Sequence, residues 1–220
     1  MVHLLKRKNI LLNDIVIIDY NMGNLRSVQK AFEKVGCDAI ISNNLDIIRN
    51  AKKIVLPGVG SFKDGMQNLK ELDLVEILNE HVIKNKKPFL GICLGMQLIA
   101  TKSYENGETI GLNWVDAEIT KFNFHTEEKK LKIPHVGWNN VDFLKNNILF
   151  EGISNNSDFY FVHSYHFVTQ ENIVTSYTDY GFNFISSIHK ENIFAFQFHP
   201  EKSQTVGLKL IKNFVNFKSE

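Results

Sequence analysis

Cys93 has the sequence surroundings of a nucleophile. It follows an apolar run at residues 89–92 that predicts a strand, and Gly91 and Gly95 flank it two positions away on either side. This is the pattern of a nucleophile elbow, where the chain turns sharply from a strand into a helix and bulky neighbours would clash. The positive end of the following helix favours the thiolate, and the N–H of Leu94 points where an oxyanion would form.

A base and a partner for it stand near the C-terminus. His199, Pro200 and Glu201 follow an apolar run at residues 193–198. Pro200 favours an extended conformation at His199, and residues two apart in an extended chain project to the same side, so His199 and Glu201 can meet. Imidazole is a base with a pKa near neutrality, and a carboxylate fixes its tautomer. Together with Cys93, these residues predict a Cys-His-Glu catalytic triad.

A glycine-rich turn at residues 57–60 follows the third predicted strand at its C-terminal end, where open α/β sheets bind their ligands. At Gly58 the main chain carries no side chain and can approach a substrate. The N–H of Val59 can then complete an oxyanion hole with that of Leu94. The stretch lacks the Gly-Lys-Ser/Thr of a phosphate-binding loop, so no nucleotide site is inferred.

Two polar side chains close to Cys93 in sequence suit an amino-acid substrate. Gln97 lies four residues beyond Cys93, one helical turn on, and can reach a substrate beside the nucleophile. Glu105 follows the same predicted helix in a polar loop, where its carboxylate suits an α-ammonium group. Either residue alone is more typical of a solvated surface, so both assignments depend on the triad.

Apolar runs and helical periodicity alternate in the first half of the chain, which is typical of a parallel sheet. Predicted strands there span residues 15–19, 39–42, 53–56 and 89–92, and predicted helices span 25–35 and 62–85. Later strand-like runs span residues 115–122, 160–165, 173–177, 185–189 and 193–198, before a last helix at 206–217. We expect an α/β three-layer sandwich with a mostly parallel central sheet and a mixed, strand-rich second half. Residues 1–14 are expected to be an N-terminal extension, and residues 15–220 are expected to form one domain.

The amino-acid composition argues against several classes of binding partner. The 25 Lys and Arg nearly balance the 24 Asp and Glu, so no overall field favours nucleic acid or an anionic membrane. The apolar runs are far shorter than the roughly 20 residues of a membrane helix. The two cysteines, Cys37 and Cys93, lack any disulfide or zinc-binding spacing. We expect a cytoplasmic protein that needs no metal and no cofactor, in which Cys37 is an ordinary structural thiol.

The combined motifs resemble those of class I, triad-type glutamine amidotransferases. The matching stretches are residues 57–60, 93–97 and 199–201. Further segments resemble the glutaminase subunits of imidazole glycerol phosphate synthases, and they lie at residues 19–25, 134–139, 160–165 and 197–203. The resemblance runs from about residue 15 to the C-terminus, with divergence in the loop at residues 103–114.

This resemblance implies an activity and a partner. The chain would hydrolyse glutamine to glutamate and ammonia, with an oxyanion hole at Gly58, Val59 and Leu94. Implied substrate contacts come from Gly60, Gln97, Glu105, Ser164 and Tyr165. Tyr160 and Lys202 match positions that face the partner subunit. That partner would be a (β/α)₈-barrel cyclase of histidine biosynthesis, bound as a heterodimer and receiving ammonia through a tunnel.

Other functions remain open at this point. A paralogue feeding ammonia to a sugar amidation enzyme of surface polysaccharide synthesis would carry the same triad. A glutaminase of pyridoxal phosphate synthesis would share it too, although the Gly-Trp-Asn and Tyr-Phe-Val-His-Ser-Tyr segments favour the histidine-type subunit. From other classes, a non-catalytic binding module would be expected to lose Cys93, and a cysteine peptidase or γ-glutamyl hydrolase would be active without a partner.

Overall fold

The computed structural model describes residues 14–124, 131–144 and 148–218. Helices α1 to α6 span Leu25–Lys34, Leu45–Asn50, Phe62–Glu71, Leu74–Asn79, Leu94–Leu98 and Gln204–Asn216. The short helical segments η1 to η3 span Glu80–Lys84, Ile148–Phe150 and Pro200–Lys202. Strands β1 to β6 span Ile15–Ile18, Ile40–Ser42, Lys53–Gly58, Phe89–Cys93, Ala100–Ser103 and Thr109–Ile110. Strands β7 to β13 span Val115–Lys121, His135–Phe143, Ser157–His163, Tyr165–Thr169, Val174–Asp179, Asn183–Lys190 and Ile193–Phe196. The expected N-terminal extension lies outside the described residues except for Asp14.

The described strands form one large sheet with a parallel half and a mixed half. The main path runs β2-β1-β3-β4-β13-β12-β10-β7-β5-β6, and β11, β8 and β9 branch from β12. The pairs from β2 to β13 are parallel, whereas β12 runs antiparallel to β13 and β10. Strand β4 lies between β3 and β13, so the carboxyl ends of these three strands meet at one edge. The predicted fold class is confirmed.

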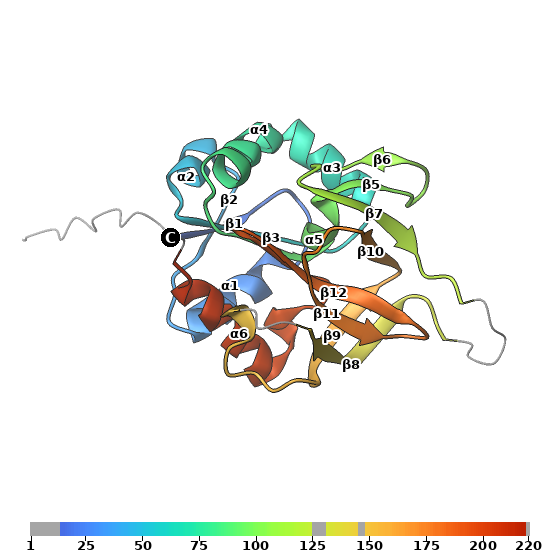
Figure 1. Cartoon of the computed structure of the whole chain (residues 1–220). Coiled ribbons are helices and arrows are strands. Elements are labelled where there is room, and N and C mark those ends of the chain that lie inside the picture. Colours follow the sequence, from blue (N-terminus) through green and yellow to red (C-terminus); the bar gives the residue numbers. More distant parts are fainter. Residues whose placement is uncertain (1–13, 125–130, 145–147, 219–220) are drawn as a thin grey trace, which may run out of the picture.

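Helices cover both faces of the parallel half, giving three layers (Figure 1). Helices α1 and α6 lie on one face, where Phe32 and Phe214 join the same buried cluster. Helices α2, α3 and α4 lie on the other face, where Ile48, Leu69 and Leu78 join a second cluster. None of the helices in the described part of the chain is long and apolar enough to cross a membrane.

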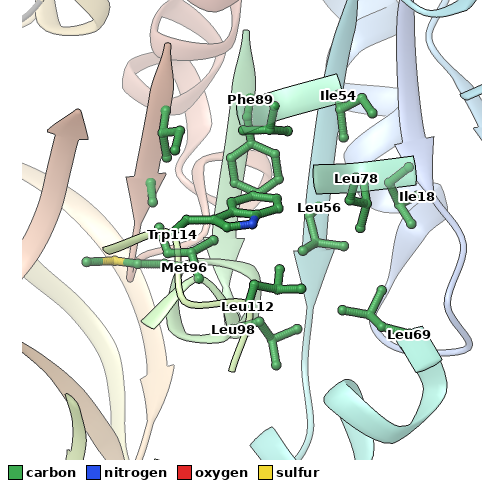
Figure 2. Close-up of a cluster of buried hydrophobic side chains, with 14 of the residues drawn as sticks. Ile18, Ile54, Leu56, Leu69, Leu78, Phe89, Met96, Leu98, Leu112 and Trp114 are labelled. Atoms are coloured by element: carbon green, nitrogen blue, oxygen red, sulfur yellow. The ribbon is translucent and has the colours of Figure 1, made fainter. Parts of the chain in front are cut away.

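The second cluster packs directly beneath the strand that carries Cys93. Phe89 of β4 meets Trp114 edge to face, with ring centroids 4.9 Å apart (Figure 2). Such a pair contributes about 0.5–1.5 kcal/mol beyond the area it buries. Met96 of α5 and Leu56 of β3 join the same cluster. This packing fixes β4 and α5 relative to each other, and therefore fixes the turn between them.

The long predicted helix at residues 62–85 is divided into three segments. Helix α3 ends at Glu71, and Asp73 adopts the left-handed conformation with φ 54°. Helix α4 then leads into the π-helical segment η1, which ends at Lys84. A continuous apolar periodicity conceals this break because both helices bury the same kind of face against the sheet.

Several other elements were not predicted, among them α2, β8 and the short strands β5 and β6. Helix α2 has only six residues and begins at Leu45. The side chain of Asn44 caps it by accepting hydrogen bonds from the N–H groups of Asp46 and Ile47. Strand β8 was not anticipated, and it pairs with β9 over seven residue pairs from His135–His163 onward. The single predicted strand at residues 160–165 is in fact the end of β9 and the beginning of β10, separated by Ser164.

Candidate active site

Cys93 lies at the sharp turn between β4 and α5. Its φ of 53° and ψ of −108° form a conformation that costs free energy in an L-residue and is typical of functional sites. A Cβ on Gly95 would collide with the carbonyl of Leu56 on β3, and one on Gly91 would lie 2.9 Å from Gly95 O. Glycines are therefore required on both sides of Cys93 for the chain to turn this closely.

Cys93 is 5% exposed, and its sulfur has two weak hydrogen-bond partners, one acceptor and one donor. Sγ lies 3.8 Å from the carbonyl oxygen of Val162, to which the S–H donates. The amide nitrogen of Gln197 lies 3.7 Å from Sγ and donates its N–H to the sulfur. The carbonyl favours the thiol and the amide favours the thiolate, so the sulfur can be stabilised in both protonation states.

His199 and Glu201 form a buried pair after β13. Nδ1 of His199 lies 2.7 Å from Oε1 of Glu201, and the two side chains are 2% and 3% exposed. The backbone of His199 is held at both ends, because its N–H donates to Tyr160 O at 2.8 Å and its carbonyl accepts from Ser203 Oγ at 2.6 Å. Nε2 of His199 is buried without a hydrogen-bond partner among the described residues.

The electrostatics of this pair favour an imidazolium. Burial alone would lower the pKa of His199, but the negative charges of Cys93 and Glu201 raise it to about 10. The same environment acts on Tyr20, whose pKa is raised well above its ordinary value by burial and by Cys93. The arrangement therefore suits an imidazolium on His199, whose charge the neighbouring Glu201 carboxylate balances.

The glycine-rich turn at the end of β3 lies beside Cys93, because Gly58 pairs in register with it. The reason for a glycine here differs from the expectation of an open approach to substrate. A Cβ on Gly58 would meet the hydroxyl of Tyr20 and lie 3.0 Å from Leu94 Cβ. That hydroxyl is buried without a hydrogen-bond partner among the described residues. The side chain of Val59, the next residue, is 40% exposed.

A pocket of about 410 Å³ opens over Cys93. Predicted site residues that line it are Val59, Gly60, Cys93, Leu94, Gln97, Glu105, Ser164, Tyr165 and Lys202. The other four predicted residues, Gly58, Tyr160, His199 and Glu201, lie outside its lining. Within the described ranges, no group of three or more His, Cys, Asp or Glu is placed to hold a metal ion.

Two polar side chains in this pocket are held by neighbouring elements. Oε2 of Glu105 accepts from the N–H of Phe62, at the start of α3, at 2.6 Å. Gln97 donates its amide N–H groups to Tyr165 O at 3.1 Å and to Gln197 Oε1 at 3.0 Å. Because both of these N–H groups are used, Gln97 offers a ligand only its carbonyl oxygen.

The pocket also contains residues that were not singled out from sequence. Pro134, Val162 and His163 line it, and Gln197 contacts Sγ although it lies outside the lining. All four stand within segments that resemble the amidotransferase family. His163 has a residue type that can do chemistry, but it is one of eight histidines and lacks the neighbouring carboxylate that marks His199. The sequence signal for Gln197 is an amide between two phenylalanines, and the structure shows that this amide is fully buried.

An exposed apolar surface lies beside the pocket on β8 and β9. Val136 is 55% exposed and Trp138 is 48% exposed. Trp138 pairs in register with Tyr160, and their rings meet edge to face at 6.0 Å. Nζ of Lys202 lies 5.4 Å from the centroid of the Tyr160 ring. Lys202 also lines the pocket, so it connects this surface with the site.

Curated relatives match almost the whole of this chain. "Imidazole glycerol phosphate synthase subunit HisH 1" of Campylobacter jejuni is 52% identical over 200 residues, covering 91% of this chain and 98% of the relative. "Imidazole glycerol phosphate synthase subunit HisH" of Aquifex aeolicus is 50% identical over 201 residues, covering 90% and 94%. The corresponding subunit of Pelagibacter ubique is 45% identical over 208 residues, covering 92% and 99%.

Solved structures and a family model agree with these relatives. The fold is similar to that of PurLQS from Thermotoga maritima, with a TM-score of 0.69 at 17% identity over 92% of this chain and 97% of the other. It is also similar to a glutamine amidotransferase from the same organism, with a TM-score of 0.62 at 16% identity over 91% and 95%. The model of the family "Glutamine amidotransferase class-I" matches residues 16–217. The chain therefore belongs to the class I glutamine amidotransferases and, within them, to the HisH family.

Proposed function

We propose that this chain hydrolyses the side-chain amide of glutamine to glutamate and ammonia through a triad of Cys93, His199 and Glu201. One observation carries the proposal: a buried imidazole–carboxylate pair lies close enough to Cys93 for the sulfur to raise the pKa of His199, and Cys93 lines a pocket. Family membership supports glutamine as the substrate.

The chemistry proceeds in two halves. Sγ of Cys93 attacks the amide carbon, forming a C–S bond and a tetrahedral oxyanion. His199 gives its proton to the amide nitrogen, the C–N bond breaks, and ammonia leaves behind a γ-glutamyl thioester. Water then gives a proton to His199 and attacks the thioester, after which the C–S bond breaks and glutamate leaves. Glu201 stabilises the imidazolium in both halves.

The oxyanion is stabilised by main-chain N–H groups in this proposal. Leu94 is the first residue of α5, so its N–H is among those left without an intrahelical partner. Val59 follows Gly58 on the neighbouring strand and lines the same pocket. Two such donors on the oxyanion are worth several kcal/mol, since removing one typically costs about 3–4 kcal/mol.

The pocket offers complementary groups for the amino-acid end of glutamine. The carboxylate of Glu105 suits the α-ammonium group, and the carbonyl oxygen of Gln97 is available as an acceptor. Gly60, Ser164 and Tyr165 complete the proposed contacts. Burial and the nearby Glu105 raise the pKa of Tyr165, so its hydroxyl stays a neutral donor or acceptor.

We further propose that the ammonia passes to a (β/α)₈-barrel cyclase in a cytoplasmic heterodimer of histidine biosynthesis. The relatives carry the name of a synthase subunit, which supports a second subunit. The exposed apolar residues Val136 and Trp138, with Tyr160 and Lys202 beside them, supply a surface for that partner next to the pocket. The cyclase would make imidazole glycerol phosphate and aminoimidazole carboxamide ribotide.

Replacing the nucleophile tests the chemistry. Cys93→Ala removes one sulfur atom and little volume, so we expect unchanged folding and partner binding with glutamate release reduced to background. Cys37→Ser is the matched control, since Cys37 is half-buried and outside the pocket lining. Glutamate release by Cys93→Ala at the wild-type rate would refute the mechanism.

The partner is tested separately by measuring glutamate release from the chain alone, and then with the candidate cyclase and its nucleotide ligand. We expect slow release alone and a steep rise with both. If the cyclase does not change the rate of glutamate release, but release still depends on Cys93, the proposed triad would stand. The ammonia would then go to another acceptor, such as a sugar amidation enzyme.

A further inference from the structure

Gln197 makes a contact with the sulfur that the triad does not explain. It follows β13, whose last pair with β4 joins Phe196 to Ile92, so the next residues along the two strands are Gln197 and Cys93. The Gln197 side chain is fully buried, and its Nε2 lies 3.7 Å from Sγ. A buried amide beside a buried sulfur is either a packing residue or a hydrogen-bond donor to the thiolate. The orientation of the amide distinguishes these two roles.

The contacts of Gln97 fix that orientation from one side. The Tyr165 carbonyl is an acceptor only, so the atom of Gln97 that faces it at 3.1 Å is the amide nitrogen. The same nitrogen lies 3.0 Å from the Gln197 side chain, which must therefore present its oxygen. The remaining atom of that amide, the nitrogen, faces Sγ of Cys93 as a donor.

His163 also contacts the Tyr165 carbonyl, and His135 in turn contacts His163. Nδ1 of His163 lies 2.8 Å from Tyr165 O and must carry the hydrogen, which leaves Nε2 as an acceptor for Nδ1–H of His135 at 3.1 Å. Nε2 of His135 then accepts from the Asn139 amide at 3.3 Å. That amide also donates to Asp179 O at 2.8 Å, which independently requires the same orientation.

Every donor along this path therefore meets an acceptor, and His163 and Gln97 both donate to the Tyr165 carbonyl. Both histidines are buried, and burial lowers the pKa of His135 to about 4 and that of His163 to about 3, so both stay neutral and keep these tautomers. The Tyr165 and Asp179 carbonyl oxygens can only accept hydrogen bonds. Gln197 therefore has no other amide orientation in which its hydrogen bonds are kept.

We propose that Gln197 is a further catalytic residue, which donates its amide N–H to Sγ of Cys93 and stabilises the negatively charged sulfur, while His163 and Gln97 are positioning residues that hold the amide in this orientation. The proposal rests on the function proposed above, in that Cys93 is the nucleophile. When the sulfur loses its proton, the contact with the Val162 carbonyl no longer stabilises it, and Gln197 is the neutral donor that remains.

Alkylation of Cys93 by iodoacetamide tests this independently of glutamine turnover. In a Cys37→Ser background, the rate is measured against pH for the wild type, Gln197→Met and Gln197→Glu. The first variant removes both hydrogen bonds without adding a charge. The second keeps an acceptor toward Gln97, loses the donor toward Sγ and places a carboxyl group beside the sulfur, so its alkylation should be at least as slow as that of Gln197→Met. Hydrogen bonds to charged groups are stronger than neutral ones, and at this long distance we expect about a tenfold fall in the alkylation rate near pH 7.

The other ionisable groups around the sulfur are unchanged in these variants. They are His199 and Glu201 after β13, Tyr20 after β1, His163 on β9, and Glu105, Tyr165 and Lys202 in the pocket. Asn192→Leu is the control for lost buried hydrogen bonds, since the Asn192 amide donates to Val82 O and Lys87 O away from the pocket. It should lower the unfolding midpoint without changing the alkylation profile.

The positioning role of His163 is tested by comparing two further variants. An asparagine at position 163 can place an amide nitrogen near the site of Nδ1, so we expect His163→Asn to preserve the alkylation rate within about threefold while His163→Leu lowers it. The double variant of His163→Leu and Gln197→Met should be no slower than Gln197→Met alone, because the effects pass through one bond. A wild-type alkylation profile in both Gln197 variants would overturn the proposal and leave the Cys93 chemistry standing; additive losses would overturn the positioning role.

Discussion

Replacing Glu201 with glutamine probes the charge in the proposed triad with little change of shape. The carboxylate is 3% exposed and lies 2.7 Å from Nδ1 of His199. Its second oxygen is buried without a hydrogen-bond partner among the described residues, so an amide in its place would leave an N–H unsatisfied as well as remove the charge. Glu201 lies outside the pocket lining, which separates this change from substrate binding.

The expected size of the effect follows from the charge that is lost. At an effective dielectric constant of about 20, unit charges about 4 Å apart attract by about 4 kcal/mol, and a neutral hydrogen bond from His199 to the amide oxygen returns about 1 kcal/mol. The net loss of about 3 kcal/mol corresponds to about two pKa units for His199. If the imidazolium is stabilised in the transition state as proposed, Glu201→Gln slows glutamate release on the order of 100-fold, with KM little changed.

The same pair predicts a pH dependence of stability. The pKa of His199 is raised to about 10 in the folded protein, against about 6.5 when unfolded. A raised pKa stabilises the fold fully below the unfolded value and loses that contribution as pH rises through the folded value. Because Glu201→Gln lowers this pKa by about two units, to about 8, the difference in unfolding free energy between wild type and variant should be full at pH 6 and shrink as the pH rises from about 8 to about 10.

Coupled detection of glutamate, with the partner present, measures the rate, and urea unfolding measures the stability. Glu171→Gln is the matched control, because this carboxylate lies 2.8 Å from Lys190 Nζ and accepts from the N–H of Asp116 at 2.6 Å, outside the pocket lining. The control should alter stability alone. A Glu201→Gln enzyme within threefold of the wild-type rate would show that the carboxylate is not part of the catalytic machinery.

Two further predictions concern stability. Lys53→Met removes an ammonium that donates to the carbonyl oxygens of Phe214 and Val215 at the end of α6, at 2.8 and 2.7 Å, and should lower the unfolding free energy by about 2–3 kcal/mol in urea. An unchanged midpoint would contradict a role in anchoring that helix. Tyr20→Phe removes a buried hydroxyl that has no partner among the described residues, so the unfolding free energy should stay constant or rise by about 1 kcal/mol. A loss greater than about 1 kcal/mol would mean that the hydroxyl is hydrogen-bonded in solution.

Short motifs predicted the local geometry of the candidate site because each motif constrains its own backbone. The spacing of Gly91, Cys93 and Gly95 describes a turn that only small flanking residues permit, and the positive φ of Cys93 bears this out. His199 and Glu201 lie two residues apart in an extended segment, so their contact follows from local backbone alone. Neither inference needed the rest of the fold.

What sequence could not supply were contacts between distant segments. Gln197 and Gln97 are 100 residues apart, and their hydrogen bond exists only because β13 lies beside β4. The tautomers of His135 and His163 likewise depend on the pairing of β8 with β9, and β8 was not anticipated. The break at Asp73 was hidden because periodicity reports which face is buried and not whether the backbone is continuous.

The strand order around β4 places the proposed site residues next to one another. Strand β4 pairs in parallel with β3 on one side and β13 on the other, so their carboxyl ends place Gly58, Cys93 and Gln197 next to one another, with His199 two residues further on. A shift of one residue in either pairing would turn the side chains of that strand to the opposite face. The positions of the proposed oxyanion turn, nucleophile, hydrogen-bond donor and base therefore depend on two registers. Both registers are held by buried apolar strands, which explains how residues so far apart in sequence can form one precise site.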